Sequence, residues 1–286
     1  MNPVDWLVCW LSELSLVFAM NRSNWKSAIR HASRALLLKP NDADLLGMRG
    51  VALLSLGKAE LAIADFSKAL ELRPTPDTYI NRAIAYRDEG EFDLSIADCD
   101  EALRLRPQDI SVHYEKAVTY RESGEYADAI ASFKTVMAVD DQLVFYCQLA
   151  ETYAEADEWD TALSTWQRGL DIYGDDPELH FTRGKAYAHR GEMQSAKADF
   201  ETALQQVNPP GTPPGRHASK VLAYLAITHE ALEQHDAADE LWRSVVSAKP
   251  EYNDPAWAES ENVSHYMQSL VEKLIARTSS TTTLNS

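Results

Sequence analysis

A repeat of 33 or 34 residues runs through this chain of 286 residues, and it restricts the fold more than any other feature. A short turn at 88–92, Asp-Glu-Gly-Glu-Phe, recurs in related form at 123–126, 156–159 and 190–193. Extending this alignment in both directions gives seven units, at 9–42, 43–75, 76–109, 110–142, 143–176, 177–218 and 219–252. Such a period predicts an array of small structural units, each of which packs on its neighbours.

Within each unit, apolar residues follow a helical period on both sides of the turn, which predicts a helix, a tight turn and a second helix. Small residues recur at the eighth position (Gly50, Ala83, Ala117, Ala150, Gly184, Ala226) and at the twentieth (Ala28, Ala62, Ser95, Ala129, Ala162, Ala196, Ala238). Large residues recur at the eleventh position (Tyr86, Tyr120, Tyr153, Tyr187) and at the twenty-fourth (Phe66, Phe133, Trp166, Phe200, Trp242). Alternating close approach and bulky filling indicates packed antiparallel helix pairs and an all-α fold.

The third unit carries the pattern of small, aromatic, small and closing proline residues as Ala83, Tyr86, Ser95, Cys99, Ala102 and Pro107. The sixth carries it as Gly184, Tyr187, Ala196, Phe200 and Ala203. On these residues the sequence resembles the tetratricopeptide repeat (TPR) family. The resemblance implies a right-handed superhelical solenoid of about seven helix-turn-helix TPR units, whose first helices line a concave face that holds other proteins.

The ends of the array receive their own predictions. The TPR array is expected over 1–252, followed by a C-terminal capping helix at 253–277 that covers the last apolar surface. The Ser- and Thr-rich tail at 278–286 is expected to be disordered. An insertion at 208–215, Asn-Pro-Pro-Gly-Thr-Pro-Pro-Gly, cannot be helical and is interpreted as a surface loop, with a hinge or a partner-contact loop as the alternative.

Comparison among the units predicts ion pairs between the two helices of a unit. Where the seventh position is Arg, the twenty-third is Asp, whereas Leu at the seventh position accompanies Thr165 or Leu241 at the twenty-third. The predicted structural pairs are Arg49 with Asp65, Arg82 with Asp98, and Arg183 with Asp199. A partly buried pair of this kind contributes more surely to specificity than to stability.

No catalytic motif is present, and the eight histidines are scattered without convergent partners, so the sequence predicts no enzyme activity, no cofactor and no metal. The three cysteines stand far apart, which favours a reducing compartment, and we expect a cytoplasmic protein. The apolar stretch at 6–20 contains Glu13 and is too short to span a membrane. With 44 acidic against 27 basic residues and a net charge of -17, nucleic-acid binding is not expected.

The TPR resemblance also implies which residues face a ligand, namely six positions on the first helix of each unit. Carried over, these positions give a groove of Asn81, Arg87, Tyr114, Glu115, Arg121, Cys147, Gln148, Glu151, Phe181, Thr182, Lys185 and Tyr224, with Ile84 and Lys220 beside them. Aromatic and polar groups in this mixture suit an extended or helical peptide. From Asp140 to Glu178 there are 11 acidic residues and one basic residue, which predicts a basic or neutral peptide near Glu151.

Two functions follow from the sequence. The first is a non-catalytic scaffold or adaptor that binds a protein or peptide segment in the groove of the TPR array. The second is a structural component that forms homo-oligomers through its terminal helices, where Trp6, Trp10 and Trp257 lie outside the repeated aromatic positions.

Overall fold

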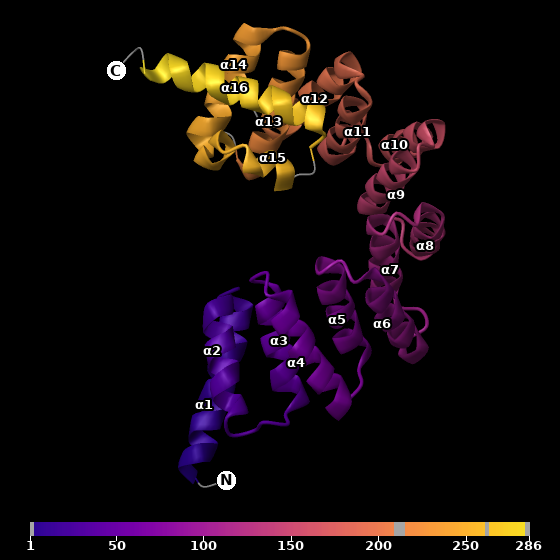
Figure 1. Ribbon diagram of the computed structural model, residues 1–286. Helices are drawn as coiled ribbons and strands as arrows, with labels where there is room; N and C mark the ends of the chain where they lie inside the picture. The colour runs from indigo at the N-terminus through magenta and orange to yellow at the C-terminus, as the bar shows by residue number, and fades with distance from the viewer. Residues whose placement is uncertain (1–2, 209–214, 261–262, 284–286) are drawn as a thin grey trace. The chain divides into compact units, whose positions relative to one another are not determined.

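The computed structural model describes residues 3–208, 215–260 and 263–283, and all the regular structure in these ranges is helical (Figure 1). The chain divides into two compact halves, an N-terminal half (Met1–Asp141) and a C-terminal half (Gln142–Ser286). The N-terminal half contains α1 (Pro3–Asn21), α2 (Trp25–Leu36), α3 (Ala43–Leu54), α4 (Ala59–Leu72), α5 (Pro76–Asp88), α6 (Phe92–Leu105), α7 (Ile110–Glu122) and α8 (Tyr126–Val139). The C-terminal half contains α9 (Leu143–Glu155), α10 (Trp159–Tyr173), α11 (Pro177–Arg190), α12 (Met193–Val207), α13 (Arg216–Ala231), α14 (His235–Ala248), the 3-10 turn η1 (Pro250–Asn253), α15 (Ala256–Ser260) and α16 (His265–Thr283).

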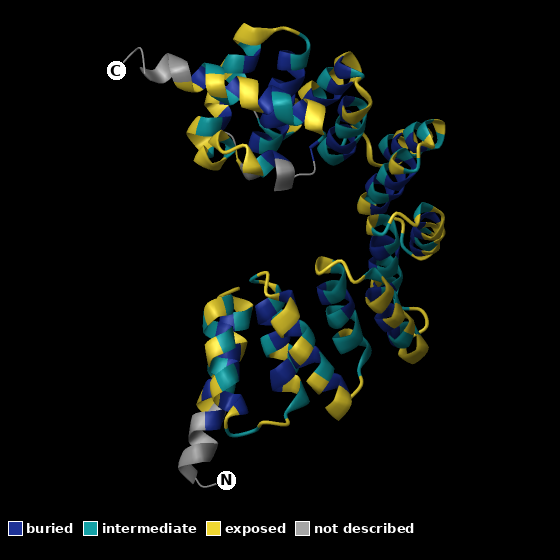
Figure 2. Ribbon diagram, viewed as in Figure 1, coloured by how far each residue is buried: buried dark blue, intermediate teal, exposed yellow. Residues whose placement is uncertain are grey.

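Consecutive helices pair as antiparallel hairpins, from α1 with α2 to α13 with α14. The hairpins follow the seven predicted repeats in order, although α1 begins at Pro3, before the first repeat at 9–42. Within each half, the second helix of a hairpin also packs on the first helix of the next one. This arrangement buries the repeated aromatic positions completely: Phe66, Phe133, Trp166, Phe200 and Trp242. Figure 2 shows buried residues on the helices of both halves. Each half is therefore a TPR-type array whose core continues from hairpin to hairpin.

The turn between the two helices of a repeat needs one residue with a positive φ. Gly124 closes the turn between α7 and α8 with a φ of +85°, in the left-handed region that favours glycine. The equivalent turn between α9 and α10 has Asp157 with a φ of 63°, and aspartate is one of the few other residues that enter this region readily. The first helices α3, α5, α7 and α11 begin at side-chain caps, as at Asp42, which accepts hydrogen bonds from the amides of Asp44 and Leu45.

The C-terminal end differs from the single capping helix expected at 253–277. Helical structure there is divided among η1, α15 and α16, and Asp254 caps the start of α15 by accepting from the amide of Ala256 at 3.0 Å. The expectation of a disordered tail at 278–286 is wrong for 278–283, which α16 includes. Thr278 is buried, and its hydroxyl donates to the carbonyl of Leu274 at 2.7 Å, so the helix continues past the predicted boundary. Residues 284–286, like 209–214 of the Pro-Gly insertion, lie outside the described residues.

None of the helices in the described ranges is long and apolar enough to cross a membrane. This holds for α1, which contains most of the apolar stretch noted in the sequence, and whose Glu13 forms an ion pair with Lys39.

Arg277 fastens α16 to the last hairpin. Its guanidinium donates to Asp239 of α14 at 2.7 Å and to both carboxylate oxygens of Glu230 of α13 at 3.0 and 2.5 Å. These hydrogen bonds from Arg277 lower the pKa of the buried Glu230 carboxyl, and His235 Nδ1 lies 3.0 Å from the same group. The last apolar surface is thus covered by a helix that is held in place electrostatically.

Replacing Arg277 with glutamine should lower the free energy of unfolding by about 1.5–3 kcal/mol, the range for hydrogen bonds to charged groups. Because folding lowers the pKa of Glu230, the stabilisation is present above its usual value of 4.5 and is lost as the pH falls through the folded-state pKa. Urea unfolding at several acidic pH values should therefore show a weaker pH dependence for Arg277→Gln than for the wild type. Lys273→Gln, an exposed change on the same helix, is the control, and an acid dependence that Arg277→Gln leaves unchanged would contradict this role.

Candidate functional site

The first helices of successive repeats contact one another directly and form a row in each half. In the N-terminal half α3 contacts α5 and α5 contacts α7, and in the C-terminal half α9 contacts α11 and α11 contacts α13. These rows carry the residues that the TPR resemblance implies for ligand binding. We therefore describe the two rows separately, as the N-terminal row (α3, α5, α7) and the C-terminal row (α9, α11, α13).

An ion network crosses the N-terminal row. Arg87 of α5 donates from Nε to Glu115 at 2.7 Å and from Nη1 to Glu122 at 2.9 Å, both on α7. Asp88 lies 3.8 Å from the same guanidinium, and burial raises the pKa of its carboxyl. Arg87 and Glu115 therefore tie two repeats together and are not open contact groups. Glu122 was not predicted, although it occupies the thirteenth position, which belongs to the ligand-facing set.

The other predicted residues of the N-terminal row are half-buried. Asn81, Tyr114 and Arg121 each keep part of their surface in contact with solvent. The Tyr114 ring packs edge-on against Phe133, with 5.9 Å between the ring centroids, so one edge of the ring is fixed by the core. These three side chains present partly exposed, positioned groups on the first helices.

The C-terminal row carries a ladder of polar side chains, which we call the polar ladder: Gln148, Glu151, Lys185 and Lys220. Gln148 donates to Glu151 at 3.2 Å within α9, and Lys185 of α11 reaches the same carboxylate at 3.5 Å. The ammonium groups of Lys185 and Lys220 each lie 5.8 Å from the centroid of the Phe181 ring. Three successive first helices thus contribute groups of both charges, and the two ammonium groups lie near one aromatic ring.

Five of the twelve predicted groove residues are buried in the structure: Glu115, Cys147, Phe181, Thr182 and Tyr224. The reason is that some ligand-facing positions turn toward neighbouring helices of the array. Thr182 accepts a hydrogen bond from Trp166 Nε1 at 3.1 Å, and the Phe181 and Tyr224 rings meet at 5.4 Å. Burial also raises the pKa of the Cys147 thiol to about 12, so this cysteine stays protonated.

The three Arg and Asp pairs lie at ion-pair distance. Each guanidinium forms two hydrogen bonds with its carboxylate, at 2.7 and 2.6 Å for Arg49 and Asp65, 2.7 and 2.7 Å for Arg82 and Asp98, and 2.8 and 2.7 Å for Arg183 and Asp199. Each pair joins the first and second helix of its own hairpin. These residues hold the two helices of a hairpin together and are not members of the polar ladder.

We next consider the side chains that metal binding or nucleophilic chemistry would need. In the part of the chain that the structure describes, no three His, Cys, Asp or Glu side chains gather as a metal site would require. Cys9, Cys99 and Cys147 are all buried free thiols. Of the terminal tryptophans, Trp257 packs on Tyr252 with 4.7 Å between ring centroids, whereas the side chains of Trp6 and Trp10 lie outside the described residues.

A family model described as tetratricopeptide repeat matches residues 17–87 and 149–225, which together exceed half of the chain. The chain belongs to the TPR family. Two further models with the same description match 76–109 and 110–142, so the TPR assignment is continuous from 17 to 142. Among curated proteins, none matches this TPR chain.

Solved structures resemble the chain in the same way. A TPR protein from Parabacteroides merdae has a TM-score of 0.71 at 17% identity, covering 94% of this chain and 99% of that one. Yeast Tom70 has a TM-score of 0.63 at 17% identity, covering 91% of this chain and 59% of that one. MamA has a TM-score of 0.52 at 18% identity, with coverages of 57% and 91%. At these identities the likeness shows the TPR solenoid fold alone.

Proposed function

We propose that this TPR protein is a non-catalytic scaffold that binds a protein segment on its first helices, with the polar ladder of the C-terminal row as the main contact. The observation that carries the proposal is the ladder itself, in which half-buried groups of both charges project from three packed helices. The scaffold holds these groups at fixed spacing, and such preorganisation lowers the entropy lost on binding. TPR proteins generally act as protein-binding scaffolds without catalysis, which agrees with this assignment.

The chemistry of the ladder favours a basic or neutral segment. A carboxylate has lone pairs for about four hydrogen bonds. Glu151 accepts from Gln148 at 3.2 Å and lies 3.5 Å from the Lys185 ammonium, and it can also accept a charge-assisted hydrogen bond from a lysine or arginine of the partner. Gln148 can bond to the backbone of an extended or helical segment. The excess of acidic residues between Asp140 and Glu178 attracts the same kind of partner over a longer range. Cytoplasmic localisation stays a prediction from the sequence.

The proposal is tested with a library of displayed peptides selected on the immobilised full-length protein. Binding of the selected peptides to Glu151→Lys should be weakened by about tenfold or more, because this change replaces an attraction by a repulsion; tenfold corresponds to about 1.4 kcal/mol. Affinities are measured by isothermal titration calorimetry at fixed salt concentration.

Glu201→Lys is the matched control for this experiment. This variant makes the same charge change on α12, which is the second helix of its hairpin. Glu201 is exposed there, and its carboxylate lies 3.8 Å from the Lys197 ammonium. Equal weakening by both variants would indicate a general effect of net charge and would reject the ladder as the site. Phe181→Ala is not suitable for this purpose, because Phe181 is buried and its loss would affect folding.

A further inference from the structure

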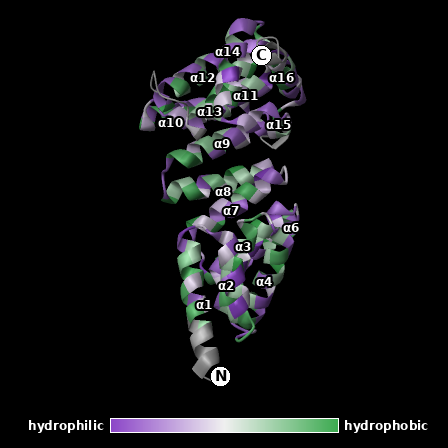
Figure 3. Ribbon diagram, turned by 90° about the vertical axis from the view of Figure 1, so that its left-hand side faces the viewer, coloured by the Kyte–Doolittle hydropathy of each residue, from purple (hydrophilic) through white to green (hydrophobic). Residues whose placement is uncertain are grey.

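The first helix has two apolar faces, and only one of them is covered. Toward α2, α1 places Cys9, Leu16 and Ala19, all of which are buried. On the other side, which we call the open stripe, lie Leu11, Leu14 and Phe18, whose exposed fractions are 47%, 56% and 58%. Figure 3 shows the hydrophobic colouring along the described part of α1. A single buried stripe is enough to attach a helix to its neighbours, so a second apolar face that stays exposed calls for an explanation.

In most later repeats, two of the three positions of the open stripe are covered by a neighbouring hairpin. Leu11 and Phe18 hold the third and tenth positions. The third position is buried as Leu45, Val112, Leu179 and Val221, and the tenth as Ala52, Ala85, Thr119 and Thr228, whereas Thr78 and Ala186 at these positions are half-buried. The cover comes from the second helix of the preceding hairpin, as where the Ser95 hydroxyl of α6 lies 3.0 Å from that of Thr119 in α7. In the described part of the chain no helix takes this place on α1. At Leu11 and Phe18 the open stripe therefore continues the interface by which the repeats stack, whereas Leu14 holds the sixth position, where Met48 of the next repeat is also exposed.

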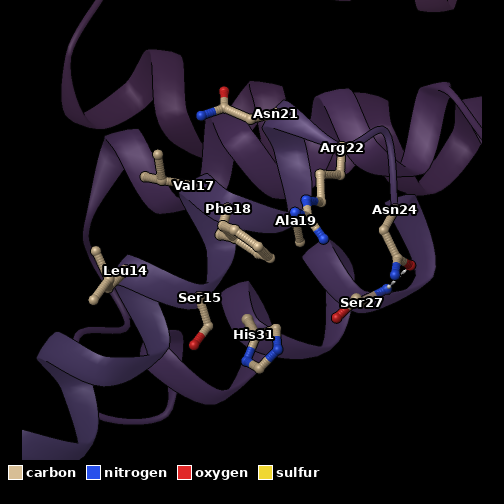
Figure 4. Close-up of a pocket in the computed structure, with 10 residues that line it drawn as sticks. All are labelled: Leu14, Ser15, Val17, Phe18, Ala19, Asn21, Arg22, Asn24, Ser27 and His31. Carbon is tan, nitrogen blue, oxygen red and sulfur yellow. Dashed lines mark hydrogen bonds between the residues drawn. The ribbon is translucent and has the colours of Figure 1, made fainter.

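The surroundings of the stripe favour an apolar helix as its occupant. A pocket of about 700 Å³ lies beside it, lined by Leu14 and Phe18 from α1 and by Ser15 and His31, which replace the Arg and Asp pair of other repeats (Figure 4). In the next two repeats, the arginine at the position of Ser15 also bonds to a serine on the preceding second helix, as Arg49 does to Ser33 at 3.2 Å. Because α1 has no such arginine, its occupant needs no polar group at this point.

The spacing of the stripe suits a second copy of the same helix. Leu11, Leu14 and Phe18 follow one another at intervals of three and four residues, the spacing of a coiled-coil seam. A seam of this kind is complementary to itself. We propose that α1 pairs with α1 of a second copy of this chain, antiparallel and related by a two-fold axis near Leu14.

The C-terminal half supplies a reason against head-to-tail assembly. The last hairpin, α13 with α14, is already covered by α16, and exposed polar residues of α16 include His265, Glu272 and Lys273. In a second copy, α14 is therefore already covered by α16 and is not available to pack on α1 in a head-to-tail arrangement. A two-fold contact uses the same surface twice and closes at the dimer.

Charge favours the same end and the same orientation. Residues 1–42 contain five basic and three acidic side chains in a chain of net charge -17, so two copies repel each other less here than at the acidic stretch from 140 to 178. Arg22, whose guanidinium lies 4.3 Å over the Phe18 ring, stands just beyond the end of α1. An antiparallel pair keeps the two Arg22 side chains apart and aligns the helix dipoles favourably.

Sedimentation velocity of the full chain over a range of about 1–100 μM should show a reversible monomer–dimer equilibrium. A single helix face is at the small end of specific interfaces, so a micromolar dissociation constant is expected. Leu14→Glu should weaken dimerisation by tenfold or more, because it places two like charges at the axis. The matched control is Leu61→Glu on α4, where the leucine is 55% exposed, and it should dimerise like the wild type.

Cysteine cross-linking tests the antiparallel orientation. Leu14→Cys should form a disulfide between two copies under mild oxidation, whereas Phe18→Cys should do so only with Leu11→Cys, about 10 Å along the helix. The native cysteines are buried and give little background.

Four results would overturn the proposal: a wild type that is monomeric throughout the range, a Leu14→Glu variant that dimerises normally, a disulfide between two copies of Phe18→Cys, or growth beyond the dimer. The first of these, together with co-sedimentation on vesicles of phosphatidylcholine and phosphatidylglycerol, would assign the stripe to a lipid surface. Circular dichroism of each variant checks that its helices are retained.

Discussion

Replacing Trp166 with alanine should lower the free energy of unfolding by about 3–5 kcal/mol, the range for removing a buried aromatic side chain. Trp166 lies on α10 and is fully buried at the twenty-fourth position of its repeat. Its Nε1 donates to the Thr182 hydroxyl of α11 at 3.1 Å. One side chain thus fills its own hairpin and joins it to the next, so the loss should affect both repeats.

Trp159 provides a control for Trp166 on the same helix. The Trp159 ring is half-buried, its Nε1 donates a hydrogen bond to Asp157 Oδ1 at 2.9 Å, and the Arg190 guanidinium lies 4.9 Å from the ring centroid. Trp159→Ala should therefore lower the free energy of unfolding by only about 1 kcal/mol. Trp166→Phe should be intermediate. Urea unfolding followed by circular dichroism measures all three, and hydrogen exchange should show faster exchange in both α10 and α11 for Trp166→Ala. Equal losses for Trp166→Ala and Trp159→Ala would show that the twenty-fourth position does not hold the repeats together.

The hairpins could be predicted from the sequence because the same turn residues and the same small and large positions recur in each repeat. The turn glycines, such as Gly124, mark where the backbone must be left-handed, and the small and large positions mark where two helices approach. Comparing repeats within one chain also pointed to contacts between helices. The exchange of Arg and Asp for Leu and Thr occurs at two positions that face each other in the hairpin.

The degree of burial on the first helices could not be predicted in the same way. Periodicity shows which side of α11 faces inward, but the neighbouring helices decide how much of that side remains accessible. Phe181 is covered because Phe200 and Tyr224 pack against it, with 5.9 and 5.4 Å between ring centroids. These contacts depend on two other helices, and a single-repeat pattern contains no information about them.

The exposed face of α1 and the length of α16 could not be predicted from the sequence for a related reason. Leu11, Leu14 and Phe18 have the composition of core residues, so sequence alone cannot show that they face outward. At the other end, the Ser- and Thr-rich segment after Arg277 has the composition of a disordered tail. There the helix continues because Thr278 is enclosed by the last hairpin and satisfies its hydroxyl on the backbone. At both ends tertiary contacts outweigh local composition.

Replacing Arg82 with leucine should lower the free energy of unfolding by about 3–5 kcal/mol, because it leaves the carboxylate of Asp98 buried without its partner. Asp98 is 5% exposed, and its two carboxylate oxygens accept hydrogen bonds from Nε and Nη2 of Arg82. Arg82 also donates to Ser67 of the preceding hairpin at 2.9 Å, so the single change also loses a contact between repeats.

The double variant Arg82→Leu/Asp98→Thr should recover most of this loss, because the chain already contains that combination. In the fifth repeat Leu149 is buried at the seventh position, and the Thr165 hydroxyl at the twenty-third donates to the Thr161 carbonyl at 2.7 Å. A threonine at 98 can satisfy its hydroxyl in the same way on the Leu94 carbonyl, four residues earlier. Urea unfolding of the wild type, both single variants and the double variant gives the coupling energy between the two sites. If the double variant is as unstable as the sum of the single changes, the pair and its neutral substitute are not equivalent, and the exchange seen among the repeats needs another cause.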